Sequence, residues 1–233
     1  MSTDPSKQPE ASTTPDATRR VRRVATGGPF VLGLVGPAGS GKSTVARALA
    51  ARGARIVNGD DLGHAVTDGD AEVRAALVAE YGPGVYRADA TLDRARVAAR
   101  VFKDAAALAR LNRLVHPRIL VLLRRAIEDA TRAGETGLFV IDAALLLDWG
   151  FERECHAVLA VLAPRDLQIA RLVSSRGWSE AHAHERLSQV RSNESFGALA
   201  DAVIMNDRSE AEAVAEAIRA TDAWRAARSA VTP

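Results

Sequence analysis

The sequence predicts an α/β fold, a parallel sheet of about five strands flanked by helices. Three observations lead to this prediction. Short apolar runs alternate with helical patterns along most of the chain, as they do when helices connect parallel strands. The first run, Phe30–Val35, is continuously apolar, which is typical of a strand buried on both faces. A glycine-rich segment, Gly36–Ser43, follows it directly and leads into a helical pattern.

The composition excludes several classes of protein. The chain has 233 residues, enough to bury a substantial core, and its single cysteine, Cys155, excludes an intramolecular disulfide framework. The net charge is +2 and arginines are scattered among acidic residues, so the charge pattern does not indicate nucleic-acid binding. No stretch approaches the roughly 20 apolar residues of a membrane span, and the polar N-terminus lacks a signal-peptide core. We expect a cytoplasmic protein that binds neither nucleic acid nor membrane.

The α/β core is predicted to occupy residues 29–60 and 133–233. Residues 1–28 contain almost no apolar side chains before Val21 and are predicted to form a disordered tail. Each predicted strand is a short apolar run, and the helices carry apolar residues at helical spacing. The strands are Phe30–Val35, Ala54–Asn58, Leu138–Ile141, Ala157–Leu162 and Ala202–Met205. The helices of the core are Thr44–Arg52, Asp166–Ser174 and Ser209–Arg228.

Two segments interrupt the alternation. Residues 61–132 show helical patterns and no strand, so roughly 80 residues separate two consecutive strands, too many for one crossover connection. This predicts an inserted helical subdomain. Its helices are Ala71–Glu80, Asp93–Phe102, Ala105–Leu111 and Arg118–Arg132. Residues 175–198 are polar, irregular and rich in arginine, and are predicted to form a mobile lid.

The glycine-rich segment matches the pattern G-x-x-x-x-G-K-[ST] at every fixed position. Its glycines allow a tight loop whose N–H groups converge on phosphate oxygens, and the helix that follows adds its positive end. The Lys42 ammonium can reach the β- and γ-phosphates, and the Ser43 hydroxyl can bind Mg²⁺. The residues expected to hold the nucleotide are Gly36, Pro37, Ala38, Gly39, Ser40, Gly41, Lys42, Ser43 and Thr44. The sequence therefore predicts a P-loop that binds a nucleoside triphosphate.

Two carboxylates are predicted at the same edge of the sheet, because they follow parallel strands. Asp60 follows the second strand and can orient or deprotonate an acceptor hydroxyl. Asp61 is an alternative for the same role. Asp142 ends the third strand, where a carboxylate can support Mg²⁺ together with Ser43. For either aspartate alone, a turn or helix cap at the strand end is the plainer interpretation, but beside a P-loop the catalytic interpretation is favoured.

The chain resembles the dephospho-coenzyme A kinase family in five segments between Phe30 and Arg208. The most distinctive segment is Leu92-Asp93-Arg94 followed by Val101-Phe102, Leu111-Asn112 and His116-Pro117, since other P-loop kinases lack this run. The others are the loop Gly36–Ser43, Val57-Asn58-Gly59-Asp60, Ile141-Asp142-Ala143-Ala144-Leu145-Leu146-Leu147-Asp148 and Ala200-Asp201-Ala202-Val203-Ile204-Met205-Asn206. In addition, Gln168 and Arg171 match a Gln-x-x-Arg in the helix before the lid. The resemblance implies a P-loop NTPase-type sheet with a helical insert and a lid.

The resemblance also implies an activity, which is the phosphorylation of the ribose 3′-hydroxyl of dephospho-CoA by ATP and Mg²⁺ in the final step of coenzyme A biosynthesis. The implied catalytic residues are Lys42, Asp60 and Arg171. The implied substrate-binding residues are Asp60, Arg94, His116 and Asp142. Arg171 would neutralise charge on the transferring group, and Asn206 falls where the family has a loop beside adenine. For His116, a buried histidine that shapes the turn before Pro117 is an equal alternative.

The chain departs from the family pattern at several positions. Val35 stands where the family often has threonine, and Asn58 replaces the first aspartate of an Asp-Ala-Asp sequence. Ala144 replaces a proline, Asp148 replaces a glutamate, and Ser175 begins the pair at the family's Arg-Asp position. Two other functions therefore stay open, a P-loop kinase acting on another nucleoside, nucleotide or small molecule, and a regulator that binds ATP without transferring phosphate. The sequence does not fix the oligomeric state, and a monomer is our expectation.

Overall fold

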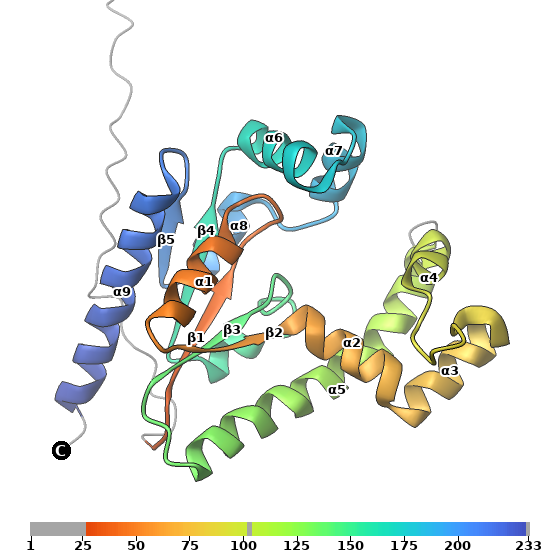
Figure 1. The fold of residues 1–233 in the computed structure, drawn as a ribbon, viewed down its shortest axis with the longest axis horizontal. Helices are drawn as coiled ribbons and strands as arrows, with labels where there is room; N and C mark the ends of the chain where they lie inside the picture. Colours follow the sequence, from red (N-terminus) through yellow and green to blue (C-terminus); the bar gives the residue numbers. More distant parts are fainter. Residues whose placement is uncertain (1–26, 102–103, 232–233) are drawn as a thin grey trace, which may run out of the picture.

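A parallel sheet of five strands forms the centre of the described chain, as the sequence predicts (Figure 1). The computed structural model describes residues 27–101 and 104–231, so the predicted tail of residues 1–28 lies almost wholly outside the described residues. The strand order is β2-β3-β1-β4-β5, and all neighbouring strands are parallel. The strands are β1 (Phe30–Val35), β2 (Arg55–Asn58), β3 (Leu138–Asp142), β4 (Ala157–Leu162) and β5 (Ala202–Met205).

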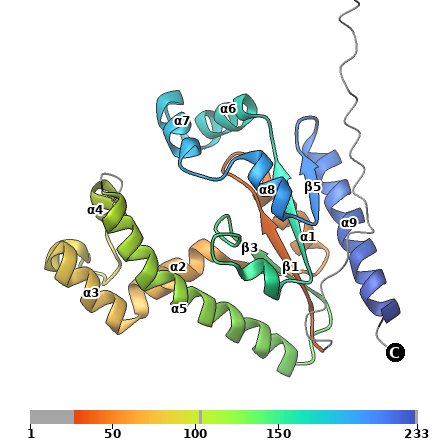
Figure 2. The ribbon, with the colours of Figure 1, turned by 180° about the vertical axis from the view of Figure 1, so that it is seen from behind.

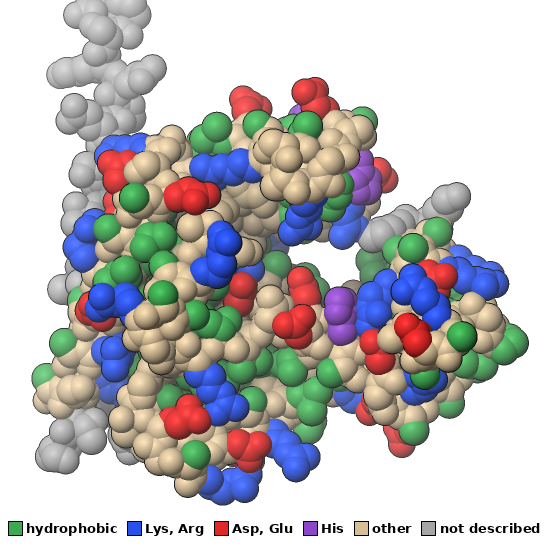
Figure 3. All heavy atoms as spheres, viewed as in Figure 1, with side chains coloured by type: hydrophobic (Ala, Val, Ile, Leu, Met, Phe, Trp, Pro, Cys, Tyr) green, Lys and Arg blue, Asp and Glu red, His purple; other side chains and the backbone are tan. Residues whose placement is uncertain are grey.

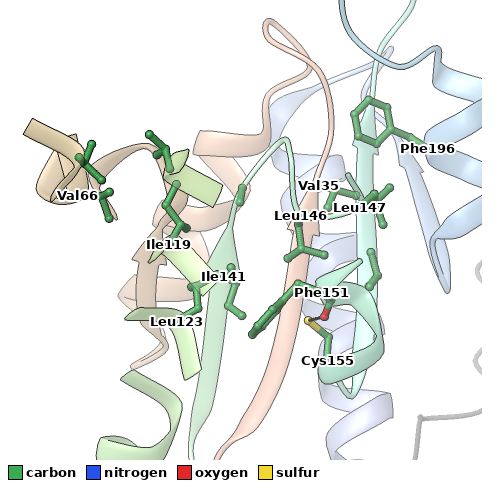
Figure 4. Close-up of a cluster of buried hydrophobic side chains, with 14 of the residues drawn as sticks. Val35, Val66, Ile119, Leu123, Ile141, Leu146, Leu147, Phe151, Cys155 and Phe196 are labelled. Carbon is green, nitrogen blue, oxygen red and sulfur yellow. Dashed lines mark hydrogen bonds between the residues drawn. The ribbon is translucent and has the colours of Figure 1, made fainter. Parts of the chain in front are cut away.

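Helices cover both faces of the sheet (Figures 1 and 2). The elements that do so are α1 (Lys42–Ala51), α5 (Ala105–Arg132), the 3-10 helix η2 (Phe151–Glu154), α8 (Asn193–Leu199) and α9 (Glu210–Val231). On one face Leu32 and Leu34 of β1 pack with α1 and α9, where Trp224 is fully buried. On the other face Val35 and Phe151 belong to a cluster that also includes side chains of α5 and α8 (Figure 4). Burial on both faces explains why β1 and β4 are continuously apolar.

The insert consists of helices, as predicted, but α2 is an additional helix, and two of the predicted helices are joined into α5. The elements after β2 are α2 (Gly59–Gly69), α3 (Ala71–Tyr81), the 3-10 helix η1 (Pro83–Val85), α4 (Arg94–Val101) and α5. The sequence did not single out α2 as a separate helix. None of the described helices combines the length and the apolar composition that crossing a membrane requires.

Helix α5 corrects the sequence prediction. The predicted helices Ala105–Leu111 and Arg118–Arg132 form one continuous helix of 28 residues that contains Pro117. A proline inside a helix removes one hydrogen bond and costs about 3 kcal/mol. The buried side chains Val115, Ile119 and Leu123 continue one apolar stripe through this position. Packing of that stripe outweighs the cost of the proline and keeps the helix intact.

The segment predicted as an irregular lid also contains helices. Helix α6 (Arg165–Arg176) is followed by α7 (Glu180–Ser188) and then α8. Ser179 caps α7 and Ser192 caps α8 through side-chain hydrogen bonds. Two buried side chains of α7, Ala183 and Leu187, pack against α6. The prediction of irregular structure over residues 175–198 is therefore wrong, because capping and packing stabilise short helices that polar composition alone does not reveal.

Helices α6 and α7 and the helical insert stand on opposite sides of a cleft. Figure 3 shows this cleft between α6 and α7 on one side and the insert on the other, with Lys and Arg side chains on both walls. In Figure 1, strands β1 and β4 run toward α6 and α7.

Replacing Leu123 with alanine tests the packing of α5. Leu123 is fully buried, so the substitution leaves a cavity, and we expect the free energy of unfolding to fall by about 2–5 kcal/mol. Urea unfolding followed by circular dichroism measures this change. Val121→Ala on the same helix is the control, because Val121 is 60% exposed. Equal effects of the two substitutions would contradict the packing that the structure assigns to α5.

Candidate active site

The predicted P-loop, residues 36–43, lies between β1 and α1 and forms a tight, closely packed turn. Gly39 and Gly41 have φ values of 76° and 93°, in the left-handed region that favours glycine. The Ser40 N–H donates to the Pro37 carbonyl at 3.3 Å and closes a tight turn. A Cβ atom on Gly36 would lie 2.1 Å from the Val161 carbonyl oxygen, so the loop also packs tightly against β4.

The loop presents hydrogen-bond donors to an anion. Helix α1 begins at Lys42, so its first N–H groups and the positive end of its dipole face the end of the loop. The Ser43 hydroxyl, in the first turn of α1, is exposed. The Ser40 hydroxyl is fully buried and has no hydrogen-bond partner among the described residues. These donors fit a phosphate group.

Two of the predicted residues, Lys42 and Asp142, form an ion pair in the structure. Asp142 is the last residue of β3 and is 5% exposed, whereas the Lys42 side chain is 16% exposed. The sheet register brings them together, because Asp142 lies opposite Leu34 of β1 and opposite Asn58 of β2. The described residues contain no group of three or more histidine, cysteine or acidic side chains that could hold a metal. Mg²⁺ bound through phosphates needs only one or two protein oxygens, and the Ser43 hydroxyl and the Asp142 carboxylate fit that requirement.

The two candidate acceptor carboxylates, Asp60 and Asp61, lie in the first turn of α2 and are both exposed. The Asn58 side chain caps this helix by accepting the Asp60 N–H at 2.8 Å. A Cβ atom on Gly59 would lie 2.7 Å from Ala143 Cβ and 3.1 Å from Trp149 Cη2, so the helix start packs tightly against the segment after β3. The structure therefore fixes the position of this turn, and both aspartates stay candidates for the acceptor hydroxyl.

Arg171 of α6 and Asn206 after β5 both contact the P-loop. Arg171 Nη1 donates to the Gly39 carbonyl at 3.3 Å, and Nη2 donates to the Asn206 carbonyl at 3.2 Å. Asn206 is 1% exposed, and its Nδ2 donates to the Ser40 carbonyl at 2.9 Å. The predicted roles of Arg171 on the transferring phosphoryl group and of Asn206 beside adenine stay predictions.

Arg94 is held within the insert. It donates to Asp68 Oδ2 at 2.8 Å and to Thr67 Oγ1 at 3.3 Å. Burial alone would raise the pKa of Asp68, but hydrogen bonds from Arg94 and from the Leu92 N–H outweigh it, and the pKa is lowered. In this structure Arg94 stabilises the fold of the insert, and its contact with substrate stays a prediction.

His116 of α5 faces Trp149, a residue that the sequence interpretation missed. The two rings are 5.7 Å apart in an edge-on arrangement. Burial lowers the pKa of His116, and the nearby Asp148 carboxylate opposes this effect. Arg191, in the predicted lid, donates to Asp148 Oδ1 at 2.8 Å and so connects the lid to this wall of the cleft. The only signal for Trp149 in the sequence is a rare tryptophan directly after the segment that ends at Asp148.

Comparisons with known proteins agree with this geometry. A family model described as dephospho-CoA kinase matches residues 30–212. The dephospho-CoA kinase of Thermobifida fusca is 36% identical over 193 residues, 83% of this chain and 94% of that protein. The dephospho-CoA kinase of Syntrophus aciditrophicus is 36% identical over 175 residues, 75% of this chain and 74% of that protein. Among solved structures, TT1252 from Thermus thermophilus is similar with a TM-score of 0.70 and 29% identity, covering 84% of this chain and 97% of that one.

The burial of His116 predicts a pH dependence of stability. Its pKa in the folded protein is below the ordinary value of 6.5, so below pH 6.5 the unfolded chain binds more protons than the folded chain. We therefore expect the free energy of unfolding to fall as the pH decreases below 6.5, and to fall less steeply in His116→Asn, whose side chain does not titrate. Urea unfolding at several pH values between 5 and 8 measures both slopes. A wild-type slope in His116→Asn would contradict the burial that the structure assigns to His116.

Proposed function

Because the chain belongs to the dephospho-CoA kinase family, we propose that it transfers the γ-phosphoryl group of ATP to the ribose 3′-hydroxyl of dephospho-CoA. This reaction is the final step of coenzyme A biosynthesis, and we place it in the cytoplasm. The observation that carries the proposal is the meeting of the P-loop, the Lys42–Asp142 pair and the turn that bears Asp60 at one edge of the sheet. All of these elements come from one chain, so a monomer contains every group that the proposal requires.

The P-loop and Lys42 bind and neutralise the triphosphate. Loop N–H groups and the start of α1 provide donors, and the Lys42 ammonium lies at the same place. Mg²⁺, when bound, would neutralise charge on the phosphates, with the Ser43 hydroxyl and the Asp142 carboxylate as its protein ligands. Lys42 and Asp142 are paired in this structure, so the pair brings a cation and a metal-binding carboxylate together before either meets the nucleotide.

The acceptor hydroxyl is oriented by an aspartate on α2. Phosphoryl transfer depends on positioning and charge neutralisation, so one exposed carboxylate that accepts the hydroxyl proton is sufficient. Asp60 directly follows Gly59, which packs tightly against the segment after β3. Asp60 is therefore held closer to the edge of the sheet than Asp61. We assign the role to Asp60.

The insert and the lid enclose the acceptor. Arg94 and His116 lie in the insert, which we propose binds the CoA portion, and Arg171 neutralises charge on the transferring group. A lid that closes the cleft keeps water from accepting the phosphoryl group. A coupled kinase assay with dephospho-CoA beside a panel of nucleosides and nucleotides tests the acceptor. Activity on another acceptor alone, or binding of ATP without any transfer, would support one of the two other functions instead.

Lys42→Ala tests the phosphate site. Removing the ammonium removes charge stabilisation of the transferred group, so we expect turnover to fall by about 100-fold or more. The substitution also leaves the Asp142 carboxylate buried without its partner, and we expect the free energy of unfolding to fall by about 3–5 kcal/mol. The double variant Lys42→Ala/Asp142→Asn should recover stability, and because Asp142 is itself a proposed Mg²⁺ ligand, its turnover is compared with that of Asp142→Asn alone, below which it should fall. Steady-state kinetics and urea unfolding measure the two effects, and a double variant with the turnover of Asp142→Asn would contradict the role of Lys42.

Asp60→Asn tests the acceptor carboxylate. The amide keeps the size of the side chain but does not accept a proton, so we expect the kcat to fall by about 100-fold or more. The affinity for ATP should change by less than about twofold, since Asp60 belongs to α2 and not to the loop. Asp61→Asn, one residue along the same exposed turn, is the matched control. If Asp61→Asn lowers the kcat instead, the acceptor carboxylate is Asp61.

A further inference from the structure

Asn206 joins the end of β5 to the P-loop. Its backbone N–H donates to the Leu162 carbonyl at 2.7 Å, directly after the last paired residue of β5. Its side chain is buried, and Nδ2 donates to the Ser40 carbonyl across 166 residues of sequence. A side chain fixed by the sheet at one end therefore holds a peptide group of the loop at the other.

The geometry of the peptide bond transmits this contact to the inside of the loop. The Ser40 carbonyl and the Gly41 N–H belong to one planar trans peptide and point in opposite directions. Because Asn206 holds the carbonyl, the Gly41 N–H must point away from Asn206. An N–H group of the G-x-x-x-x-G-K-[ST] loop that is fixed in direction can bind a phosphate oxygen without further reorganisation.

The Asn206 amide lies so close to Gly41 that a side chain at position 41 would not fit beside it. A Cβ atom on Gly41 would lie 2.1 Å from Asn206 Nδ2, and the φ of Gly41 is +93°. Glycine is therefore required at position 41 both by the backbone conformation and by the close approach of this amide.

Arg171 determines which end of the Asn206 amide faces the loop. Its Nη2 lies 3.5 Å from Asn206 Oδ1 and donates to the Asn206 carbonyl at 3.2 Å. A guanidinium group only donates hydrogen bonds, so the amide oxygen faces Arg171 and the amide nitrogen faces the Ser40 carbonyl. An aspartate at position 206 would still accept from Arg171, but it would have no hydrogen to donate to Ser40.

We propose that Asn206 is a positioning residue for phosphoryl transfer, which acts through the Ser40 carbonyl to hold the Gly41 N–H in its phosphate-binding direction. The proposal rests on the proposed nucleotide site at residues 36–44. Asn206 does not itself contact the triphosphate. Its effect is on the shape of the loop before the nucleotide arrives, so it lowers the cost of ordering the loop on binding.

Asn206→Asp and Asn206→Ala test this role, because both remove the donor to Ser40. The first readout needs no nucleotide. Amide hydrogen–deuterium exchange of residues 36–44 in the ligand-free protein should increase in both variants. The second readout is the Kd for ATP, measured by calorimetry. It should rise by about 10-fold to 100-fold, as expected when the buried Ser40 carbonyl loses its hydrogen-bond donor. The KM for dephospho-CoA should change by less than about twofold, since the acceptor side is untouched.

Thr221→Val is the control for general loss of stability. Thr221 is 1% exposed and donates to the Ala217 carbonyl within α9, on the face of the sheet that α9 covers. It should lower the melting temperature without changing loop exchange or the Kd for ATP. Unchanged exchange and unchanged Kd in the Asn206 variants would overturn the proposal, as would equal changes in Thr221→Val.

If Asn206→Asp does not fold, Asn206→Ala carries the same test without a new charge.

Failure of the proposed function is distinguishable from failure of this inference. A wild-type protein that binds ATP but does not phosphorylate dephospho-CoA contradicts the function, while the comparison of Kd values and loop exchange still decides the role of Asn206.

Discussion

The parallel register of the sheet is the constraint on which the site depends. Leu34 lies opposite Asp142, and Asp142 lies opposite Asn58, so the ends of β1, β3 and β2 are level. The P-loop, a buried carboxylate and the first turn of α2 therefore meet at one edge of the sheet, where side-chain contacts such as the Lys42–Asp142 ion pair join them. A shift of one residue in β3 would turn the Asp142 side chain to the other face of the sheet and separate it from Lys42.

The polar groups at this edge of the sheet stabilise one another, because burying any one of them without a hydrogen-bond or ion-pair partner would cost free energy. Asp142 is buried, and its carboxylate is compensated by the Lys42 ammonium. The Ser40 carbonyl is compensated by Asn206, and the Gly39 carbonyl by Arg171. These partners come from β3, from the end of β5 and from α6. The sheet and α6 therefore hold the loop from several directions. A loop held in this way can keep its N–H groups free for an anion.

Local patterns predict much of the fold, and contacts between distant segments account for the differences. The five strands and the P-loop have signals within a few residues, such as the apolar run Phe30–Val35. The unbroken α5 does not, because Pro117 is a strong local signal for a helix end and only the buried stripe of α5 overrides it. Trp149 has only a weak signal in the sequence, and the contact between Asn206 and Ser40 has none. Their roles follow from the packing of segments that the sequence places far apart.

The structure gives a physical reason for three departures from the family pattern. Asn58 caps α2, a position at which asparagine and aspartate are equally effective, and it leaves one fewer negative charge beside Asp60. Val35 is fully buried at the end of β1, where a hydroxyl group would need a hydrogen-bond partner and a methyl group does not. Asp148 binds Arg191 of the lid segment, so the shorter acid has its own partner. The departures are therefore matched by contacts within this chain, and they leave the P-loop and the Lys42–Asp142 pair unchanged.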